Sequence, residues 1–259
     1  MKAGKIALNI IKWTGITLIG VVFVLFAVGL WLDKPMPEGY GSPQDADRLA
    51  RKVQATVNLA DWDSTGAIQW TFAGMNRHLW DRERGYAEVR WGNTRVLVDL
   101  NTQRGVAYEN GGEQIGQGAT ELVKQAYSTW VNDAFWLNPV AKFFDEGTTR
   151  ELVKWEDGST GLMVHYNSGG VTPGDSYGWE LGPDNQPTGW RMWVSVLPVG
   201  GLYASWEDWQ QLSTGAWIAT AHKFGPVGGT MITDAKAAPT LEELVPNEED
   251  PFAALEKRK

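Results

Sequence analysis

The stretch GDSYG, residues 174–178, matches the G-x-S-x-G motif that presents a nucleophilic serine in α/β-hydrolases. Ser176 would be the nucleophile, and Asp208 and His222 follow it in the order acid, then histidine. That chemistry needs a strand before the serine and a helix after it, whereas Pro173 precedes the motif and a strand-and-turn pattern follows it. A Ser176-dependent esterase is therefore the least favoured function, and we expect no catalytic residues and no enzyme.

Metal chemistry finds little support in the sequence. The chain has no cysteine, which excludes disulfides and thiolate ligands. Its three histidines, His78, His165 and His222, fall in separate predicted strands without the close spacing of a metal motif. We predict no metal and no cofactor.

Two polar residues interrupt an aromatic helical stretch. Asn132 and Asp133 lie between Trp130 and Trp136. They either tether the helix to a sheet or bind the headgroup of a ligand, and tethering is the favoured reading.

Aromatic side chains are the most informative feature. Thirteen of the 15 tryptophans follow residue 34, and each ring can bury roughly 150–250 Å². Large flat rings pack poorly without smaller partners, so a surface lined by them either leaves an apolar hollow for an acyl chain or closes as a solid core. Both alternatives stay open. Strand alternation puts one set of side chains on a common sheet face, and helical spacing turns a second set toward it: Trp70, Phe72, Trp91, Tyr177, Trp179, Trp190 and Met192 from strands; Tyr127, Trp130 and Phe135 from the helix.

Most of the elements that carry these side chains are predicted strands, and only one long helix interrupts them. Apolar spacing predicts helices over 45–59, with Asp45 as N-cap, and over 119–139, where Pro139 ends the second. A hairpin turns at Gly92–Asn93. Further strands are predicted at 67–72, 77–80, 105–109, 149–155, 160–166, 177–181, 190–196, 202–212, 216–224 and 230–235. The pattern predicts a mainly β, α+β fold and argues against a Rossmann or barrel-type α/β fold, because it lacks βαβ alternation.

The strand at 202–212 is ambiguous. If it is regular, Trp206 and Trp209 point to opposite faces of the sheet, which requires aromatic packing on both sides.

The N-terminus predicts a membrane anchor. Residues 13–32 contain no charge over 20 positions, about the length of a membrane-spanning helix, and Trp13 and Trp31 mark its ends. Three lysines precede the stretch, so we expect a cytoplasmic N-terminus and an exported remainder. A cleaved signal peptide is the alternative, but its apolar core is normally shorter, about 7–15 residues.

Charge excludes one class of partner. Residues 1–34 hold four of the chain's 23 basic residues and one of its 31 acidic ones, which leaves the exported part 19 basic and 30 acidic residues and a formal charge of −11. Such a surface repels phosphate backbones, so we expect no nucleic-acid partner. The predicted organisation is an anchor at 1–34, a linker at 35–44, a folded domain at 45–238 and an acidic, mobile tail at 239–259.

Several segments resemble a known group of exported bacterial proteins. RHLWDRERGYAEVRW, WVNDAFWLNP, GVTPGDSYGWEL and LSTGAWIATAHKF are similar to the LolA/LolB-like superfamily, in particular to its uncharacterised outer-membrane lipoprotein-sorting-like families. The resemblance covers about residues 45–235. It implies an open half-barrel, a curved antiparallel sheet with helices in its concavity, that holds lipids or acyl chains. It also implies an aromatic lining of Trp70, Trp91, Trp179 and Trp190, with Trp130 and Trp136 on the covering helix.

These observations lead to one expected function. The chain is expected to be a single-pass inner-membrane protein whose periplasmic domain holds a lipid or a lipoprotein acyl chain. A tethered interaction or sensor module with a solid core is the alternative. The sequence does not identify any protein partner.

Overall fold

The computed structural model describes residues 33–169, 171–224, 229, 231–246 and 249–258. The predicted anchor at 13–32 lies outside these residues. Within the described residues, no helix combines the length and the apolar character that crossing a bilayer requires.

Antiparallel strands dominate the chain, as predicted. A 6-stranded sheet has the order β1-β8-β9-β10-β11-β12, a 2-stranded sheet pairs β13 with β14, and a 7-stranded sheet has the order β15-β2-β3-β4-β5-β6-β7. Their bounds are β1 Gly39–Tyr40, β2 Ala67–Phe72, β3 Asn76–Asp81, β4 Tyr86–Trp91, β5 Thr94–Asp99, β6 Arg104–Glu109, β7 Gly112–Glu113, β8 Thr148–Lys154, β9 Thr160–Tyr166, β10 Asp175–Leu181, β11 Pro187–Trp193, β12 Leu202–Ser205, β13 Glu207–Gln211, β14 Trp217–Ala221 and β15 Ile232–Ala238.

The single continuous sheet that was predicted is divided into three. Isolated hydrogen bonds join the parts: Trp206 N donates to Thr188 O (2.9 Å), and Met231 N donates to Thr220 O (3.1 Å). The end strands β1 and β7 do not pair with each other, so the sheets do not close into a barrel.

The predicted hairpin at Gly92 is confirmed. β4 pairs with β5 so that Val89 faces Val96, and Gly92 adopts φ +51° in the turn, a conformation that glycine accepts without strain.

The predicted strand at 202–212 breaks at Trp206. β12 ends before this residue and β13 begins after it, and Asp208 has φ +53°. This break removes the alternation on which the prediction for Trp206 and Trp209 relied. Both side chains pack against the same core cluster, with ring centroids 6.2 Å apart, so the expectation that they lie on opposite faces is wrong.

The helices begin and end at identifiable caps. Ser42, not Asp45, is the N-cap of α2 (Pro43–Thr56), because the Ser42 side chain accepts from Asp45 N and the Asp45 carboxylate accepts from Ser42 N. α3 (Leu59–Ser64) follows at once. α4 (Gly116–Leu137) ends before Pro139, as predicted, and the chain continues in a short 3₁₀ helix, η1 (Pro139–Lys142).

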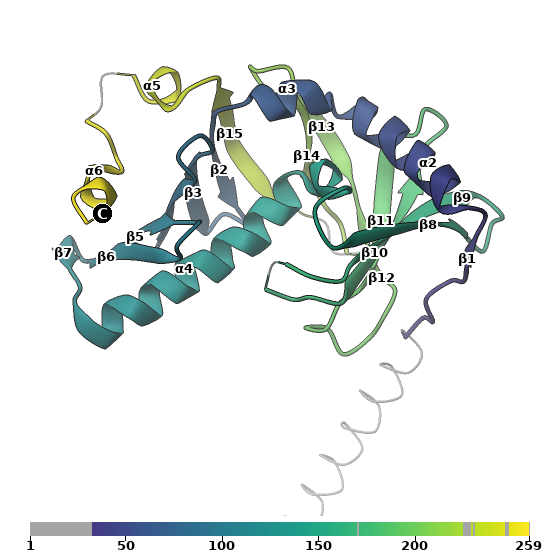
Figure 1. Ribbon diagram of the computed structural model, residues 1–259, viewed down its shortest axis with the longest axis horizontal. Coiled ribbons are helices and arrows are strands. Elements are labelled where there is room, and N and C mark those ends of the chain that lie inside the picture. Colours follow the sequence, from purple (N-terminus) through teal and green to yellow (C-terminus); the bar gives the residue numbers. More distant parts are fainter. Residues whose placement is uncertain (1–32, 170, 225–228, 230, 247–248, 259) are drawn as a thin grey trace, which may run out of the picture.

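The core follows the inner faces of the sheets. Figure 1 shows α4 running along the 7-stranded sheet toward the 6-stranded one, while α2 covers β8 and β9 of the 6-stranded sheet and α3 continues from α2 toward β2. Under α4, the strands β4 to β6 contribute small aliphatic side chains, while the 6-stranded sheet contributes tryptophans. Trp136, on the last turns of α4, packs against buried residues from both sheets.

The C-terminal segment is held against the protein rather than free. The short helices α5 (Leu241–Leu244) and α6 (Ala253–Glu256) lie on the side of the 7-stranded sheet away from α4 (Figure 1). Phe252 is fully buried, 5.7 Å from the Tyr86 ring, and Asp250 pairs with Arg84 at 2.8 Å. The prediction of a mobile tail is therefore wrong for residues 249–258. The prediction rested on the acidic composition of the segment, which favours solvent exposure. It did not take account of Phe252, whose buried ring holds the segment against the sheet.

Candidate functional site

The ten predicted lining residues divide evenly by exposure. Five are buried in the core: Trp70, Phe72, Trp179, Trp190 and Met192. The other five are only partly buried: Trp91, Tyr127, Trp130, Trp136 and Tyr177. All ten contribute to the packing beneath and around α4, but they belong to three neighbouring clusters instead of one surface.

The densest aromatic group surrounds Trp190 on β11. Its ring centroid lies 4.6 Å from Trp136 and from Tyr177, and 5.0 Å from Trp179. We call this group the Trp190 cluster, and its members are Phe135, Trp136, Tyr177, Trp179, Trp190 and Trp206. Trp179, Trp190 and Trp206 fill its interior, whereas Phe135, Trp136 and Tyr177 form a partly exposed rim.

A second aromatic group lies under the 7-stranded sheet. Trp70 stacks on His78 with centroids 4.5 Å apart, and Trp130 meets Trp80 edge-on at 5.0 Å. Trp91 and Tyr127 continue this side of α4, where they pack against the aliphatic strands.

Asp133 connects α4 to the 7-stranded sheet. Its carboxylate is 2 % exposed, lies 2.7 Å from His78 Nε2 and accepts from Asn76 Nδ2 at 2.9 Å. Asn132 Nδ2 donates to the other carboxylate oxygen. The predicted tether of helix to sheet is confirmed. The carboxylate has enough donors around it to compensate its burial.

Several buried polar atoms near α4 have no hydrogen-bond partner among the described residues. They include the indole nitrogens of Trp179, Trp190 and Trp206, the Tyr166 hydroxyl and His222 Nε2. An unpaired buried donor is destabilising by about 1–3 kcal/mol, so such a concentration is unusual in a core. Indole nitrogens can only donate, and the group is therefore complementary to a molecule that supplies oxygen acceptors.

His222 lies beside the Trp190 cluster with its ring 4.5 Å from Trp206 and 5.1 Å from Trp136. Its Nδ1 lies 2.9 Å from Ser205 O, so this nitrogen carries the proton and Nε2 is an unprotonated acceptor. Burial lowers the pKa of His222 to about 4, because charging the ring would require solvation that the site lacks. Burial also raises the pKa of Tyr166 and of Tyr177. At neutral pH the site therefore contains neutral rings.

The hydrolase motif lacks its required setting. Ser176 lies within β10, followed by a turn into β11, and not at a strand-to-helix elbow. Its hydroxyl pairs with His165 Nδ1 at 2.8 Å across the strand pair, whereas His222 bonds Ser205. The order Ser176, Asp208, His222 is thus not assembled into a triad.

No group of three or more His, Asp or Glu side chains among the described residues lies close enough to hold a metal ion.

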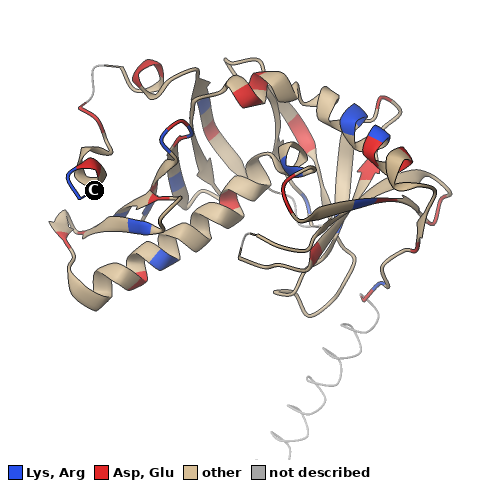
Figure 2. Ribbon diagram, viewed as in Figure 1, with Lys and Arg blue, Asp and Glu red and all other residues tan. Residues whose placement is uncertain are grey.

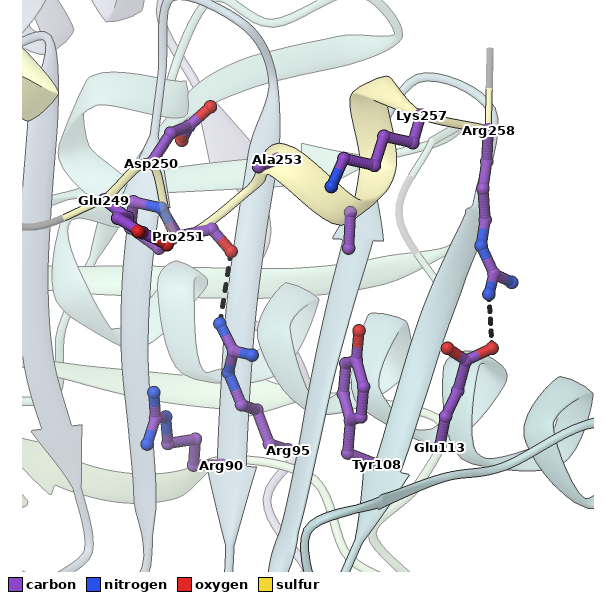
Figure 3. Close-up of a pocket in the computed structure, with 11 residues that line it drawn as sticks. Arg90, Arg95, Tyr108, Glu113, Glu249, Asp250, Pro251, Ala253, Lys257 and Arg258 are labelled. Carbon is purple, nitrogen blue, oxygen red and sulfur yellow. Dashed lines mark hydrogen bonds and ion pairs between the residues drawn. The ribbon is translucent and has the colours of Figure 1, made fainter.

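Two polar hollows lie on the other side of the 7-stranded sheet from α4. The larger, of about 860 Å³, separates the sheet from the C-terminal segment (Figure 3). Arg95 donates across it to Pro251 O, and Arg258 pairs with Glu113 at its edge. A second hollow of about 580 Å³ adjoins Gln69, Arg77 and Glu88. Both contain charges of each sign and neither matches an apolar ligand.

The sequence missed four members of the aromatic region. Trp206, Phe224, Tyr166 and His222 contact it. The orientation of Trp206 was predicted from a regular strand that does not exist, and His222 was considered only for catalysis and metal binding. The signal that was available is the concentration of aromatics around 203–224, which does not depend on strand alternation.

Comparisons with known proteins give a likeness in structure and none in sequence. No protein-family model matches the chain, and no curated protein matches it. Among solved structures, it is similar to a domain from Vibrio parahaemolyticus described as an outer membrane lipoprotein-sorting protein, with 11 % identity and a TM-score of 0.34. The likeness covers 81 % of this chain and all of that domain. At this TM-score and identity, no residue of the site can be transferred from one chain to the other.

Proposed function

We propose that this protein is a membrane-anchored, exported binding protein that holds the acyl group of a lipid or lipoprotein at the rim of the Trp190 cluster. The anchor is the apolar stretch at 13–32, and the binding domain is exported to the periplasm. The protein acts by binding and not by catalysis.

The observation that carries the proposal is the combination of apolar rings and unpaired donors at one place. Phe135, Trp136 and Tyr177 offer a partly exposed aromatic rim, and each Å² of apolar surface that a ligand covers contributes roughly 25 cal/mol. The nearby unpaired groups are mainly N–H and O–H donors. An acyl chain with an ester or amide carbonyl fits both features, since its tail would cover the rings and its oxygen would accept from a donor.

Neutral rings favour the same class of ligand. His222 is uncharged at neutral pH, and the exported part has a formal charge of −11. No cation of the cluster would select an anionic headgroup, so recognition would rest on the apolar chain and the carbonyl.

The experiment is a search for co-purifying lipid. Residues 33–259 are purified without detergent, extracted with organic solvent and analysed by mass spectrometry. Acylated molecules in a fixed ratio to protein are expected. If protein that neither contains lipid nor takes it up from added vesicles is recovered in folded form, the proposal fails.

One observation favours a second function. The interior rings of Trp179, Trp190 and Trp206 touch one another at 5.0–5.2 Å, as in a filled core. A tethered interaction or sensor module with no ligand would show this packing. A fluorescent apolar probe separates the two functions, because it gains fluorescence only where a ring surface is accessible.

A further inference from the structure

The loop that joins β11 to β12 contains only uncharged residues and exposes an apolar side chain to solvent. Residues 194–201 read VSVLPVGG and carry no charged side chain, although the exported part of the chain has a formal charge of −11. Val196 at the tip is 72 % exposed, and Val171, in the segment between β9 and β10, is 45 % exposed. Figure 2 shows the loop below β11 and β12 without charged residues.

This loop has a defined conformation. Ser195 N donates to the buried Asp175 carboxylate at 2.8 Å, and Leu197 N donates to Val194 O at 3.1 Å. Val194 and Leu197 turn inward and pack against the core that contains the Trp190 cluster. The exposure of Val196 thus results from a folded turn whose neighbouring apolar side chains are anchored inside.

The same loop holds the end of the predicted anchor. Gly200 N donates to Asp33 Oδ1 at 2.7 Å, Lys34 N donates to Gly200 O at 3.0 Å, and Trp193 Nε1 donates to Lys34 O at 2.8 Å. Asp33 directly follows residue 32, the last position of the apolar stretch. Figure 1 shows the first described residues (purple) reaching this end of the 6-stranded sheet.

The segment that contains Val171 and the loop leave the 6-stranded sheet at the same end, where Ser195 N donates to Asp175 at the start of β10. We propose that residues 194–201, together with Val171, form a lip that contacts the outer surface of the membrane in which residues 13–32 are anchored. This inference rests on the anchor in the proposed function, and it adds an orientation to it. If the span ends at residue 32, the bonds to Gly200 hold the lip within a few residues of the bilayer surface. Uncharged apolar groups enter that interface readily, whereas the acidic remainder is repelled by anionic lipids.

The lip would also shorten the path of an acyl chain. Leu197 packs against the same core as the rim residue Tyr177, and Tyr177 pairs with Met192 just before the loop. The rim residue Tyr177 is thus paired with the strand that leads into the lip.

The test places a probe at the lip and a matched probe away from it. Because the chain contains no cysteine, Val196→Cys gives a single labelling site in the full chain. Ser159→Cys is the control, since Ser159 is exposed in the turn between β8 and β9, at the opposite end of the same 6-stranded sheet. Each variant carries a polarity-sensitive fluorophore and is reconstituted into phosphatidylcholine liposomes that contain a nitroxide-labelled lipid.

The expected result is quenching at least about twofold stronger at position 196 than at position 159. Equal quenching at the two positions, or full chain that does not float with the liposomes, overturns the proposal. Lipid extraction from residues 33–259 tests the acyl site without a membrane, so loss of the lip and loss of the acyl site give different results.

A second variant checks that the labelled cysteine does not create the contact. In the full chain with Val196→Asp, a label on Val171→Cys should lose at least half of its quenching, because a carboxylate resists entry into the interface. Undiminished quenching at position 171 would contradict a shared lip.

Discussion

The inner faces of the two large sheets are built from different side chains. Strands β4 to β6 face α4 with Val89, Val96 and Ala107, small groups that pack closely beneath Val123 of the helix. The 6-stranded sheet faces the end of α4 with tryptophans whose indole nitrogens have no partner. Both regions are antiparallel sheets covered by a helix, and both are buried.

This difference in side chains indicates that one region has a structural role and the other a role in ligand binding. The strands β4 to β6 contribute no unpaired buried side-chain nitrogen or oxygen of their own among the described residues, although Trp130 of α4, which packs against them, has an unpaired indole nitrogen. The Trp190 cluster contains three unpaired indole donors in contact with one another, whereas the other unpaired indoles, those of Trp70, Trp130 and Trp155, lie apart from this cluster. We infer that the ligand chemistry of the protein belongs to the 6-stranded end, while β4 to β6 and α4 hold that end in place.

The largest effect is expected from truncating the centre of the aromatic region. Trp190→Ala should lower the free energy of unfolding by about 3–5 kcal/mol, since it removes a fully buried ring with five aromatic neighbours. Val96→Ala in the aliphatic region should lower it by only about 2 kcal/mol. Urea denaturation followed by circular dichroism measures both. Equal losses would remove the distinction between the two regions.

Acid should weaken the aromatic region through His222. An unfolded histidine has a pKa of about 6.5, and burial lowers that of His222 to about 4. A depressed folded pKa means that the stability is fully present above pH 6.5 and is lost as the pH falls toward 4, by about 3 kcal/mol.

His222→Asn checks the assignment, because its amide can still donate to Ser205 O but does not titrate. The measurement is the free energy of unfolding at pH 7, 5.5 and 4 for both proteins. The variant should lose about 3 kcal/mol less than the wild type over this range. Parallel curves would assign the acid sensitivity to other groups.

The smallest effect concerns the outer face of the 7-stranded sheet. Arg84 donates to Asp250 from both terminal nitrogens and to Asp81 from Nε, which fixes the C-terminal segment. Arg84→Gln should cost about 1 kcal/mol, because the Arg84 side chain is about a third exposed and solvent screens the pair.

Hydrogen exchange of residues 249–258 reports the loss locally. Arg191→Gln is the matched control, since Arg191 pairs with Glu180 at 2.8 Å on the 6-stranded sheet. Faster exchange of this segment is expected in Arg84→Gln alone. If both variants behave alike, the segment is held by Phe252 and not by its charges.

The sequence predicted the parts of the fold that depend on local pattern. The hairpin at Gly92, the end of α4 before Pro139 and the inward faces of Trp70 and Trp190 each follow from spacing within a few residues. The break at Trp206 could not be predicted, because it depends on how β12 and β13 pair with different sheets. The buried C-terminal segment was missed for a similar reason: the site that receives Phe252 is formed by strands more than 140 residues earlier.

The candidate site was predicted by residue type better than by exposure. Strand alternation identified the rings that share a face of the sheet. It could not show which of these rings would be covered by neighbouring side chains. Trp179 is enclosed by other rings, whereas Tyr177 two residues earlier stays partly exposed. The unpaired indole donors could not be predicted at all, since hydrogen bonding depends on the assembled packing.

The most direct test of the central claim measures binding of a fluorescent fatty-acyl ester, an uncharged probe, to residues 33–259. Trp136→Ala removes a ring of the aromatic rim, and Trp155→Ala removes a ring of the same kind from the other face of the 6-stranded sheet, where it contacts Gly178 and Arg191. The account predicts that the wild type and Trp155→Ala bind the probe with similar affinity, while Trp136→Ala binds about tenfold more weakly, a loss of about 1.4 kcal/mol. No binding by the wild type, or an equal loss in both variants, would contradict it.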